Sequence, residues 1–122
     1  MEAKWTPRLA DPEVFTVELI EGPSGVLGFS CVEVIPDTRP FLDNLHVAPD
    51  TRRTGVGSTL MASIFERLRR EDNSVFELDV FEHNDAARAF YERWGGHVAS
   101  TFDEHGPEGS VIPSVRYRFE LS

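Results

Sequence analysis

The feature that most constrains this chain is a short loop, rich in arginine and glycine, that leads straight from an apolar segment into an amphipathic one. The apolar segment is residues 41–47, and the loop carries Arg52, Arg53, Gly55 and Gly57. A helix that begins without a spacer presents unpaired backbone N–H groups, and glycines without a Cβ let an anion approach them. The sequence therefore predicts a site for a phosphorylated ligand.

The spacing of the glycines excludes two common phosphate sites. A P-loop requires Lys-Ser/Thr after its last glycine, but Gly57 is followed directly by Ser58. The dinucleotide fingerprint requires a third glycine where this chain has Leu60. The remaining pattern is Arg52-x-x-Gly55-x-Gly57. Taken alone, it fits either an anion site or an ordinary glycine-rich turn with surface arginines.

Length and composition predict one soluble domain spanning residues 1–122. The chain is 40% apolar and 27% charged, which is ordinary for a globular protein. No segment approaches the roughly 18 apolar residues of a membrane span, and the N-terminus lacks a signal-peptide apolar region. The single cysteine, Cys31, suits a reducing compartment. We expect a cytoplasmic protein that does not bind a membrane.

The charge distribution argues against nucleic-acid binding. The net charge is −9, whereas neutralising phosphates along a nucleic acid requires a basic face. The positive charge is nearly all arginine, and Arg39, Arg52 and Arg53 lie near the glycine-rich loop. An acidic protein can thus bind an anion locally, while its overall field weakly favours a cationic co-substrate.

Hydrophobic periodicity and turn residues divide the chain into alternating strands and helices. The strand–helix–strand unit at 41–81 implies parallel pairing with a right-handed crossover. Asn84 or Asp85 caps the second helix, and Gly95-Gly96 ends it. Residues 1–13, which include Pro7 and Pro12, are expected to be irregular. The predicted strands are residues 14–20, 26–35, 41–47, 75–81, 97–101 and 114–121, the first two forming a hairpin, and the predicted helices are residues 57–70 and 86–94.

A second motif follows the strand predicted at 75–81. An Asn at position 84 precedes Ala87-x-x-Phe90-Tyr91-x-x-x-Gly95. Together with the Arg52–Gly57 pattern, in the same order and separation, this motif resembles the GNAT superfamily of acyl-CoA-dependent N-acyltransferases over residues 14–121. The resemblance implies an α/β fold, in which a central mixed sheet is built on a β-α-β-α-β core.

The chain departs from the family pattern at its N-terminus. Family members usually begin with a strand and two helices, which form a wall of the acceptor pocket. Because about 13 residues precede the first predicted strand, we expect this N-terminal strand and these helices to be reduced. Charged residues also share sheet faces, Glu77 with Asp79 and Arg116 with Arg118 and Glu120, so one face is not a covered core. Either this face stays open or a second subunit covers it, and we expect a homodimer.

The resemblance also implies a donor and its site. The co-substrate is expected to be acetyl-CoA, with no metal. Backbone N–H groups of Arg53, Gly55 and Gly57 are expected at the pyrophosphate with the Arg52 side chain nearby, and the Val47 N–H at the developing oxyanion. The full expected set of donor-binding residues is Leu45, Val47, Arg52, Arg53, Thr54, Gly55, Val56, Gly57, Ser58, Asn84 and Tyr91.

Two side chains are the candidates for proton transfer. On the second helix Tyr91 lies at the edge of an apolar stripe, where it could either pack or point its hydroxyl into a cleft. The resemblance favours Tyr91 as the general acid. Asp43, on the strand at 41–47 and expected to share a face with Leu45 and Val47, is the candidate base. Asp43 could equally be a polar strand residue with no catalytic role. The weaker candidates for the base are Glu33, Glu77, Asp79 and His46.

These expectations combine into an N-acetyltransferase that acts on a primary amine of a small molecule or peptide. No Cys–His pairing is evident, so direct attack in a ternary complex is expected rather than an acyl-enzyme. Two alternatives stay open: a non-catalytic acyl-CoA-binding module, and a dimeric interaction protein with a GNAT-like sheet. The acceptor could be a polyamine, an aminoglycoside-like amine, an amino acid or a protein N-terminus.

Overall fold

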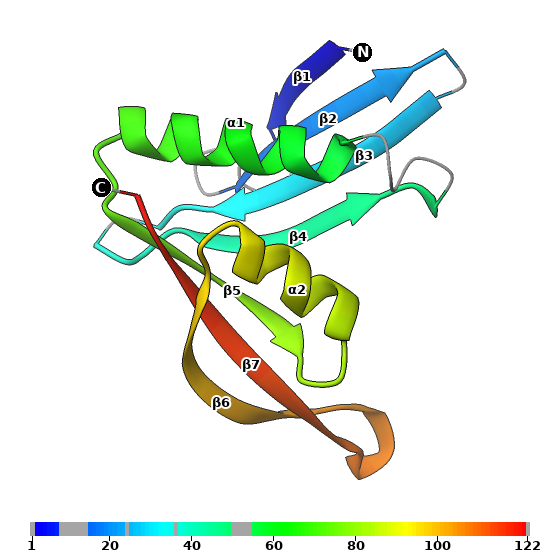
Figure 1. The fold of residues 1–122 in the computed structure, drawn as a ribbon, viewed down its shortest axis with the longest axis vertical. Helices are drawn as coiled ribbons and strands as arrows, with labels where there is room; N and C mark the ends of the chain where they lie inside the picture. Colours follow the sequence, from blue (N-terminus) through cyan, green and yellow to red (C-terminus); the bar gives the residue numbers. More distant parts are fainter. Residues whose placement is uncertain (1, 8–14, 24, 36, 50–54, 122) are drawn as a thin grey trace.

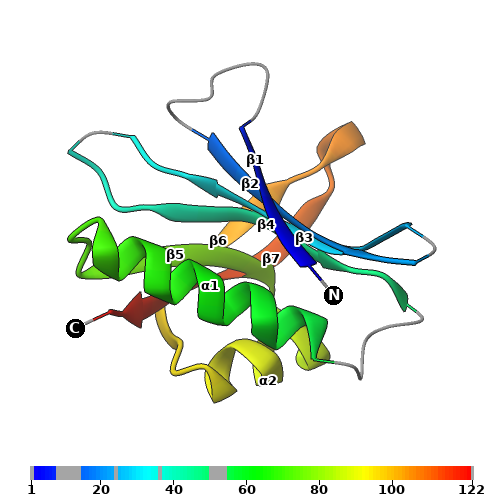
Figure 2. The same ribbon diagram turned by 90° about the horizontal axis from the view of Figure 1, so that it is seen from above.

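Both α-helices lie on the same face of a twisted seven-stranded sheet (Figures 1 and 2). The computed structural model describes residues 2–7, 15–23, 25–35, 37–49 and 55–121. The strand order is β1-β2-β3-β4-β5-β7-β6. The elements are β1 (Glu2–Pro7), β2 (Phe15–Gly22), β3 (Gly25–Glu33), β4 (Phe41–Val47), α1 (Val56–Arg70), β5 (Val75–Phe81), α2 (Asp85–Arg93), β6 (His97–His105), the short 3-10 helix η2 (Pro107–Gly109) and β7 (Val111–Glu120).

The mixed sheet and its β-α-β-α-β core are confirmed. β2 and β3 form the expected antiparallel hairpin, and β4 and β5 pair in parallel around α1. Both helices begin and end within a residue of their predicted limits. The elements with clear periodicity were therefore the ones that the sequence located correctly.

The prediction of an irregular N-terminus is wrong for residues 2–7. These residues form β1, which pairs antiparallel with β2 from Glu2↔Glu21 to Pro7↔Thr16. Pro7 ends this edge strand, a position where proline's missing N–H breaks no central ladder. Local propensity is weak here, and pairing with β2 determines the structure. The N-terminal strand is therefore retained. Residues 8–14 separate β1 from β2 in the sequence, and the expectation of reduced helices there lies outside the described residues.

The last two strands are longer than predicted. β6 and β7 form a long hairpin that extends away from the helices, with η2 at its tip (Figure 1). Their ladder runs from His97↔Arg118 to His105↔Val111. Because nearly every residue of β6 is exposed, the strand lacks the hydrophobic alternation by which a half-buried strand is recognised.

The main core lies between α1 and the sheet. Leu60, Met61, Ile64 and Leu68 of α1 are fully buried and repeat at helical spacing. Aromatic rings fill the space beneath the end of the helix: Phe76 and Phe119 stack with centroids 4.7 Å apart, and Phe65 packs edge-on against both. This core fixes α1 against β5 and β7. A second cluster, in which Val56 and Leu60 pack with Val47, holds the N-terminus of α1 above the end of β4.

One polar side chain is buried under α1. Glu18 of β2 is 0% exposed; its Oε2 accepts a hydrogen bond of 2.6 Å from the Ser63 hydroxyl, and its Oε1 has no partner among the described residues. Burial raises the pKa of Glu18, although the Ser63 hydrogen bond and the charge of Arg67 oppose the shift. A raised folded-state pKa stabilises the fold below the unfolded value of 4.5, and this contribution is lost as the pH rises through the folded value.

The Glu18→Gln substitution should therefore reduce the pH dependence of stability. An amide cannot ionise, so the variant avoids the cost of burying a carboxylate above about pH 4.5. We expect the Tm of the variant minus that of the wild type to increase as the pH rises from about 4 to 8. Glu66→Gln, at an exposed position of the same helix, is the control. A Tm difference that does not change with pH would contradict this account.

β4 separates from β5 soon after the two strands meet. Among the described residues they pair only at Phe41↔Glu77 and Leu42↔Leu78. Beyond Leu42, β4 continues beside β3 as far as Gly28↔Val47, whereas β5 follows β7. The rest of β4 therefore has one edge without a neighbouring strand, and this opening lies beside the N-terminus of α1 (Figure 1).

The sheet face away from the helices carries the charged residues that the sequence placed there. Arg118 contacts Glu77 at 2.7 Å, and Arg116 makes two hydrogen bonds to Asp79, of 2.8 and 3.0 Å. Ion pairs therefore cross from β5 to β7 on this face. Neither helix in the described part of the chain has the length and apolar character that crossing a membrane requires.

Candidate functional site

The N-terminus of α1 presents backbone donors with no partner in the helix. Gly55 is the N-cap, with the left-handed φ of 83° that glycine adopts freely, and no side chain caps the helix. The first helical hydrogen bond runs from the Thr59 N–H to the Gly55 carbonyl at 2.9 Å, so the N–H groups of residues 56–58 have no intrahelical acceptor. No acidic residue lies in the first turn. The helix start therefore favours an anion.

Gly57 lies where α1, α2 and β4 approach one another. A Cβ at this position would be 3.3 Å from Phe90 Cζ and 3.5 Å from Val47 Cγ2. The Cβ of a helical residue points toward the helix N-terminus, so a longer side chain would extend toward the space in front of the helix start. Glycine at this position therefore allows the close packing of Phe90 and Val47 and leaves the backbone N–H groups accessible to a ligand.

The open edge of β4 supplies a further backbone donor. The Ala48 N–H donates to the Leu27 carbonyl of β3 at 2.8 Å. Because successive peptide groups of a strand point to opposite sides, the N–H of Val47 points away from β3. Among the described residues no strand pairs with β4 at this point, so the Val47 N–H faces the opening between β4 and β5.

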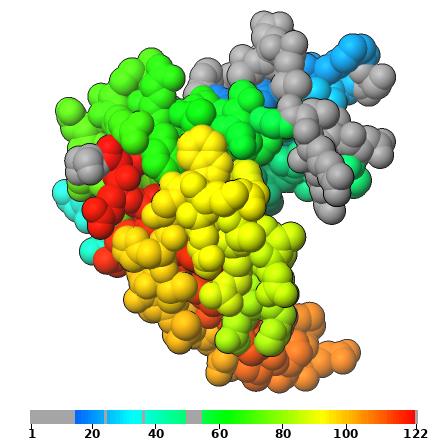
Figure 3. Space-filling view, in the orientation of Figure 1, coloured from blue at the N-terminus to red at the C-terminus, as the bar shows by residue number. Residues whose placement is uncertain are grey.

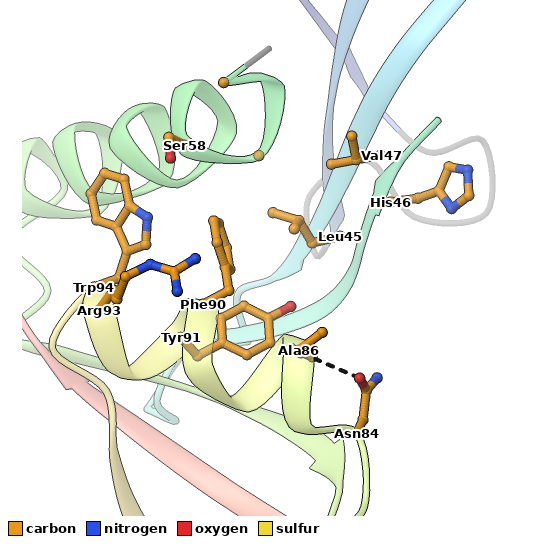
Figure 4. A pocket seen from close by; sticks show the side chains of 13 residues that line it. Leu45, His46, Val47, Ser58, Asn84, Ala86, Phe90, Tyr91, Arg93 and Trp94 are labelled. Atoms are coloured by element: carbon orange, nitrogen blue, oxygen red, sulfur yellow. Dashed lines mark hydrogen bonds between the residues drawn. The ribbon is translucent and has the colours of Figure 1, made fainter. Parts of the chain in front are cut away.

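A cavity of about 600 Å³ joins these elements. Its size is that of a small-molecule site. Leu45 points into it, whereas the ring of His46 points away and packs 5.5 Å from Phe29 (Figure 4). The described lining comprises Leu45, His46 and Val47 of β4, Gly55, Gly57 and Ser58 at the start of α1, and Asn84, Ala86, Ala87, Phe90, Tyr91, Arg93 and Trp94 of α2 and its ends.

Tyr91 is the titratable hydroxyl of the cavity. Its ring packs against the main core, and its hydroxyl points away from α2 into the cavity (Figure 4). Burial raises the pKa of Tyr91, so the phenol keeps its proton at neutral pH. Within the described part of the chain this hydroxyl makes no hydrogen bond, which leaves it available to a ligand.

Asn84 has a structural role at the edge of the same cavity. It is the N-cap of α2, and its Oδ1 accepts a hydrogen bond of 3.2 Å from the Ala87 N–H (Figure 4). The sequence left Asn84 and Asp85 as alternative caps, and the structure selects Asn84. Its side-chain amide group remains on the cavity wall as a possible donor.

The structure does not bring Asp43 to this cavity. The β3–β4 register shifts, with Cys31 opposite Asn44 and Val32 opposite Leu42, so Asp43 is the unpaired residue of a bulge. The bulge lets Leu42 and Leu45 both pack toward the helices, although strict alternation would put them on opposite faces. The expectation that Asp43 shares a face with Leu45 and Val47 through simple alternation is therefore wrong. Asp43 is exposed and is absent from the described lining, and its role as base stays a prediction.

The rival carboxylates lie elsewhere. Glu77 and Asp79 are held in ion pairs on the face opposite the helices, and Glu33 lines a separate hollow at the other end of β4. Of the predicted donor-binding residues, Leu45, Val47, Gly55, Gly57, Ser58, Asn84 and Tyr91 line one cavity. Val56 is buried beneath the helix start. The predictions for Arg52, Arg53 and Thr54 lie outside the described residues.

Arg93 was missed by the sequence analysis. It is the one lysine or arginine among the described lining residues, and no aspartate or glutamate lines that part of the cavity. Its guanidinium lies 6.0 Å from the centre of the Phe90 ring (Figure 4). The signal was present in the sequence, because Ala86, Phe90 and Arg93 follow one another at spacings of four and three along one helical face. No cluster of three or more potential metal ligands occurs among the described residues.

Comparison with known proteins decides the family. The sequence model of the Acetyltransferase (GNAT) family matches residues 2–96, which include the N-terminus of α1, the open edge of β4 and all of α2. The chain belongs to the GNAT acetyltransferase family. The resemblance seen in the two sequence motifs is thereby confirmed. No curated protein sequence matches the chain.

Solved structures confirm the GNAT fold. The IAA acetyltransferase from Bacillus cereus superimposes with a TM-score of 0.83 at 14% identity, covering 98% of each chain. The ribosomal-protein-S18-alanine N-acetyltransferase from Escherichia coli gives a TM-score of 0.79 at 23% identity, covering 90% of this chain and 71% of that one. A Bacillus anthracis structure, described as a streptothricin acetyltransferase in complex with acetyl coenzyme A, gives 0.76 at 18% identity, covering 88% and 62%. At these identities the likeness concerns the fold.

Proposed function

We propose that this GNAT protein is an N-acetyltransferase that transfers an acetyl group from acetyl-CoA to a primary amine. One observation carries the proposal. A single cavity is lined by an uncapped helix N-terminus, the open edge of β4 at Val47 and the hydroxyl of Tyr91. The related Bacillus anthracis structure contains acetyl-CoA, which supports the choice of donor.

The residues present fit the donor. Acetyl-CoA supplies an activated acyl thioester on an arm that is joined through a pyrophosphate to a phosphorylated adenosine. The N–H groups at the start of α1, which have no intrahelical acceptor, suit the pyrophosphate, and the absence of a Cβ at Gly57 keeps them accessible. Arg93 adds a positive charge to the described lining, which holds no carboxylate. The site as a whole is therefore suited to an anionic ligand.

Two further groups suit the chemistry of acetyl transfer. The Val47 N–H, on the open side of β4, is a donor for negative charge that develops on the thioester oxygen. The Tyr91 phenol, kept protonated by burial, can give its proton to the departing thiolate. Cys31 is buried in β3 and does not belong to the described lining, so direct attack by the amine is the simplest route.

The acceptor is proposed to be an amine of a small molecule or a peptide. The structural relatives include an enzyme named for alanine of a ribosomal protein and others named for small molecules. The cytoplasmic location and the homodimer expected from the sequence stay predictions. A second subunit could add to the acceptor wall, because residues 8–14 leave little chain between β1 and β2.

That short connection also favours the second candidate, an acyl-CoA-binding module without catalysis. The two candidates share the donor cavity and differ in whether an amine is acetylated. Incubation with acetyl-CoA and a panel of polyamines, aminoglycosides, amino acids and peptides, followed by mass spectrometry, separates them. We expect at least one acceptor to gain an acetyl group in an enzyme-dependent manner. Donor binding with no acetylated product across the panel would favour the binding module.

Arg93→Gln should weaken acetyl-CoA binding. Removing a guanidinium that contacts a phosphate costs about 1.5–3 kcal/mol, so we expect Kd to rise by roughly tenfold or more, and less at high salt. Arg70→Gln, which removes the same charge at the far end of α1, is the matched control. Calorimetric titration measures both. Equal weakening by the two substitutions would show a general charge effect and would contradict a contact by Arg93.

A further inference from the structure

A buried tyrosine of β7 connects the sheet to α2. Tyr117 is 0% exposed, and its hydroxyl lies between two side chains one helical turn apart on α2. Arg88 Nε donates to the Tyr117 oxygen at 2.9 Å, and the Tyr117 hydroxyl donates to Glu92 Oε2 at 2.5 Å. A hydroxyl can accept and donate at the same time, so each charged side chain has the partner that it needs.

The same arginine reaches the turn that precedes the helix. Arg88 Nη1 donates to the Glu82 carbonyl at 3.1 Å, and the Glu82 N–H donates to the Pro113 carbonyl of β7 at 2.9 Å. The network therefore joins β7, the end of β5 and the middle of α2. We call Arg88, Glu92 and Tyr117 the α2 clamp.

α2 has few other means of fixing its orientation. It is nine residues long, and none of its residues is fully buried. It contacts the main core through the partly buried rings of Phe90, Tyr91 and Trp94. Apolar contacts of this kind resist separation but are not directional, so they permit a small rotation of a short helix. Hydrogen bonds to charged groups are directional and limit such a rotation.

Rotation of α2 bears directly on the proposed acid. Tyr91 precedes Glu92, and its ring centroid lies 6.4 Å from that of Tyr117. Arg88 and Glu92 face β7 while the Tyr91 hydroxyl points into the cavity (Figure 4). A change at the clamp would therefore move the hydroxyl of Tyr91 relative to Val47. A displacement of about 1 Å is enough to cost a large factor in rate.

We propose that the α2 clamp of Arg88, Glu92 and Tyr117 holds the hydroxyl of Tyr91 in its reactive position. The three are positioning residues, since none of them lines the cavity in the described structure. Their catalytic effect rests on the proposed acetyl transfer, whereas their hold on the helix does not. Burial and the hydrogen bond to Glu92 raise the pKa of Tyr117, so its hydroxyl stays a donor across the pH range of an assay.

The test compares three variants that change one group each. Tyr117→Phe removes the hydroxyl and keeps the ring in the core. Glu92→Gln keeps an oxygen acceptor for the hydroxyl and is the conservative replacement. Ala89→Gln, at an exposed position of α2 outside the clamp, is the control, because alanine and glutamine both favour helix.

Amide hydrogen exchange and steady-state kinetics are measured on all three variants and the wild type. Loss of hydrogen bonds to charged groups should speed exchange of α2 amides in Tyr117→Phe by about tenfold, with α1 unchanged. We expect kcat to fall by about tenfold and KM for acetyl-CoA to change less than threefold, since the start of α1 is not altered. Glu92→Gln should stay close to the wild type in both the exchange of α2 amides and kcat, because it keeps an acceptor for the Tyr117 hydroxyl. Ala89→Gln should match the wild type.

The two readouts separate the clamp from the proposed function. Faster amide exchange in α2 but not in α1 of Tyr117→Phe supports the role of the clamp in holding the helix, whether or not the wild type transfers an acetyl group. A wild type that transfers no acetyl group would contradict the proposed function and not the clamp. Unchanged exchange in α2 overturns the clamp. A lower Tm with unchanged kcat and KM below the transition also overturns it, because the hydroxyl would then serve stability alone.

Discussion

Replacing Tyr91 with phenylalanine is expected to lower acetyl transfer by about a hundredfold while leaving the affinity for acetyl-CoA within about twofold of the wild type. The substitution removes one oxygen and keeps the ring that packs against the core. The hydroxyl has no hydrogen bond to the described residues, so its loss leaves none of their polar groups unpaired. The effect should therefore fall on kcat, measured from initial rates of CoA release.

The pH dependence adds a second test of the same residue. Burial raises the pKa of Tyr91 above the ordinary tyrosine value of about 10. An acid must be protonated to act, so its contribution persists through the neutral range and is lost only as the pH rises through this elevated value. We expect no decline in kcat caused by Tyr91 between about pH 7 and 9.5. Unchanged turnover in Tyr91→Phe would remove this residue as the acid.

Replacing Gly57 with glutamate is expected to abolish the stabilisation of the protein by acetyl-CoA. The new side chain would extend into the space in front of the start of α1, because the Cβ of a helical residue points toward the helix N-terminus. It would also place a negative charge where the pyrophosphate is expected. At a hundred times Kd, acetyl-CoA should raise the Tm of the wild type by roughly 10 °C and that of the variant hardly at all.

Gly57→Gln is the matched control, since it adds nearly the same volume without the charge. We expect it to retain a reduced shift, and the difference between the two variants measures the electrostatic part. Circular dichroism of both apo-proteins establishes that they are folded. A shift in Gly57→Glu equal to that of the wild type would show that the donor binds elsewhere.

The parts of the fold that could be predicted are those with a strong internal pattern. α1 repeats its apolar residues at helical spacing, and Asn84 and Gly95 mark the ends of α2 by capping chemistry. β1 and the far half of β6 could not be predicted, because they are stabilised by pairing with a neighbouring strand. Such pairing is set by residues distant in the sequence, so it leaves little local signal.

The candidate site shows a similar division. The glycine spacing predicted the start of α1 as a binding site, and the Asn84–Gly95 motif predicted Tyr91; the structure places both in one cavity. Both predictions succeeded because each motif reflects local backbone geometry. Asp43 was misplaced since strict alternation cannot anticipate a bulge, which depends on the register between β3 and β4. The partnership of Tyr117 with Arg88 and Glu92 joins elements 25 to 29 residues apart, and no spacing rule within one element reveals it.

The ion pairs on the open face bear on the base. Arg118 and Arg116 hold Glu77 and Asp79 in ion pairs on the face of the sheet opposite the helices, and neither carboxylate lines the described cavity. Asp43 is free of such a pair among the described residues, but it lies outside the described cavity. An amine that reaches the site already neutral would need no base from the protein.

The most direct test of the account is the release of CoA thiol from acetyl-CoA, followed in a rapid-quench experiment with and without amine acceptors. Direct attack within a ternary complex predicts release that requires an acceptor, with no burst when the acceptor is omitted. A burst of CoA stoichiometric with the protein in the absence of an acceptor would indicate an acyl-enzyme and contradict direct attack. If no amine in a broad panel elicited release, acetyl transfer itself would be contradicted.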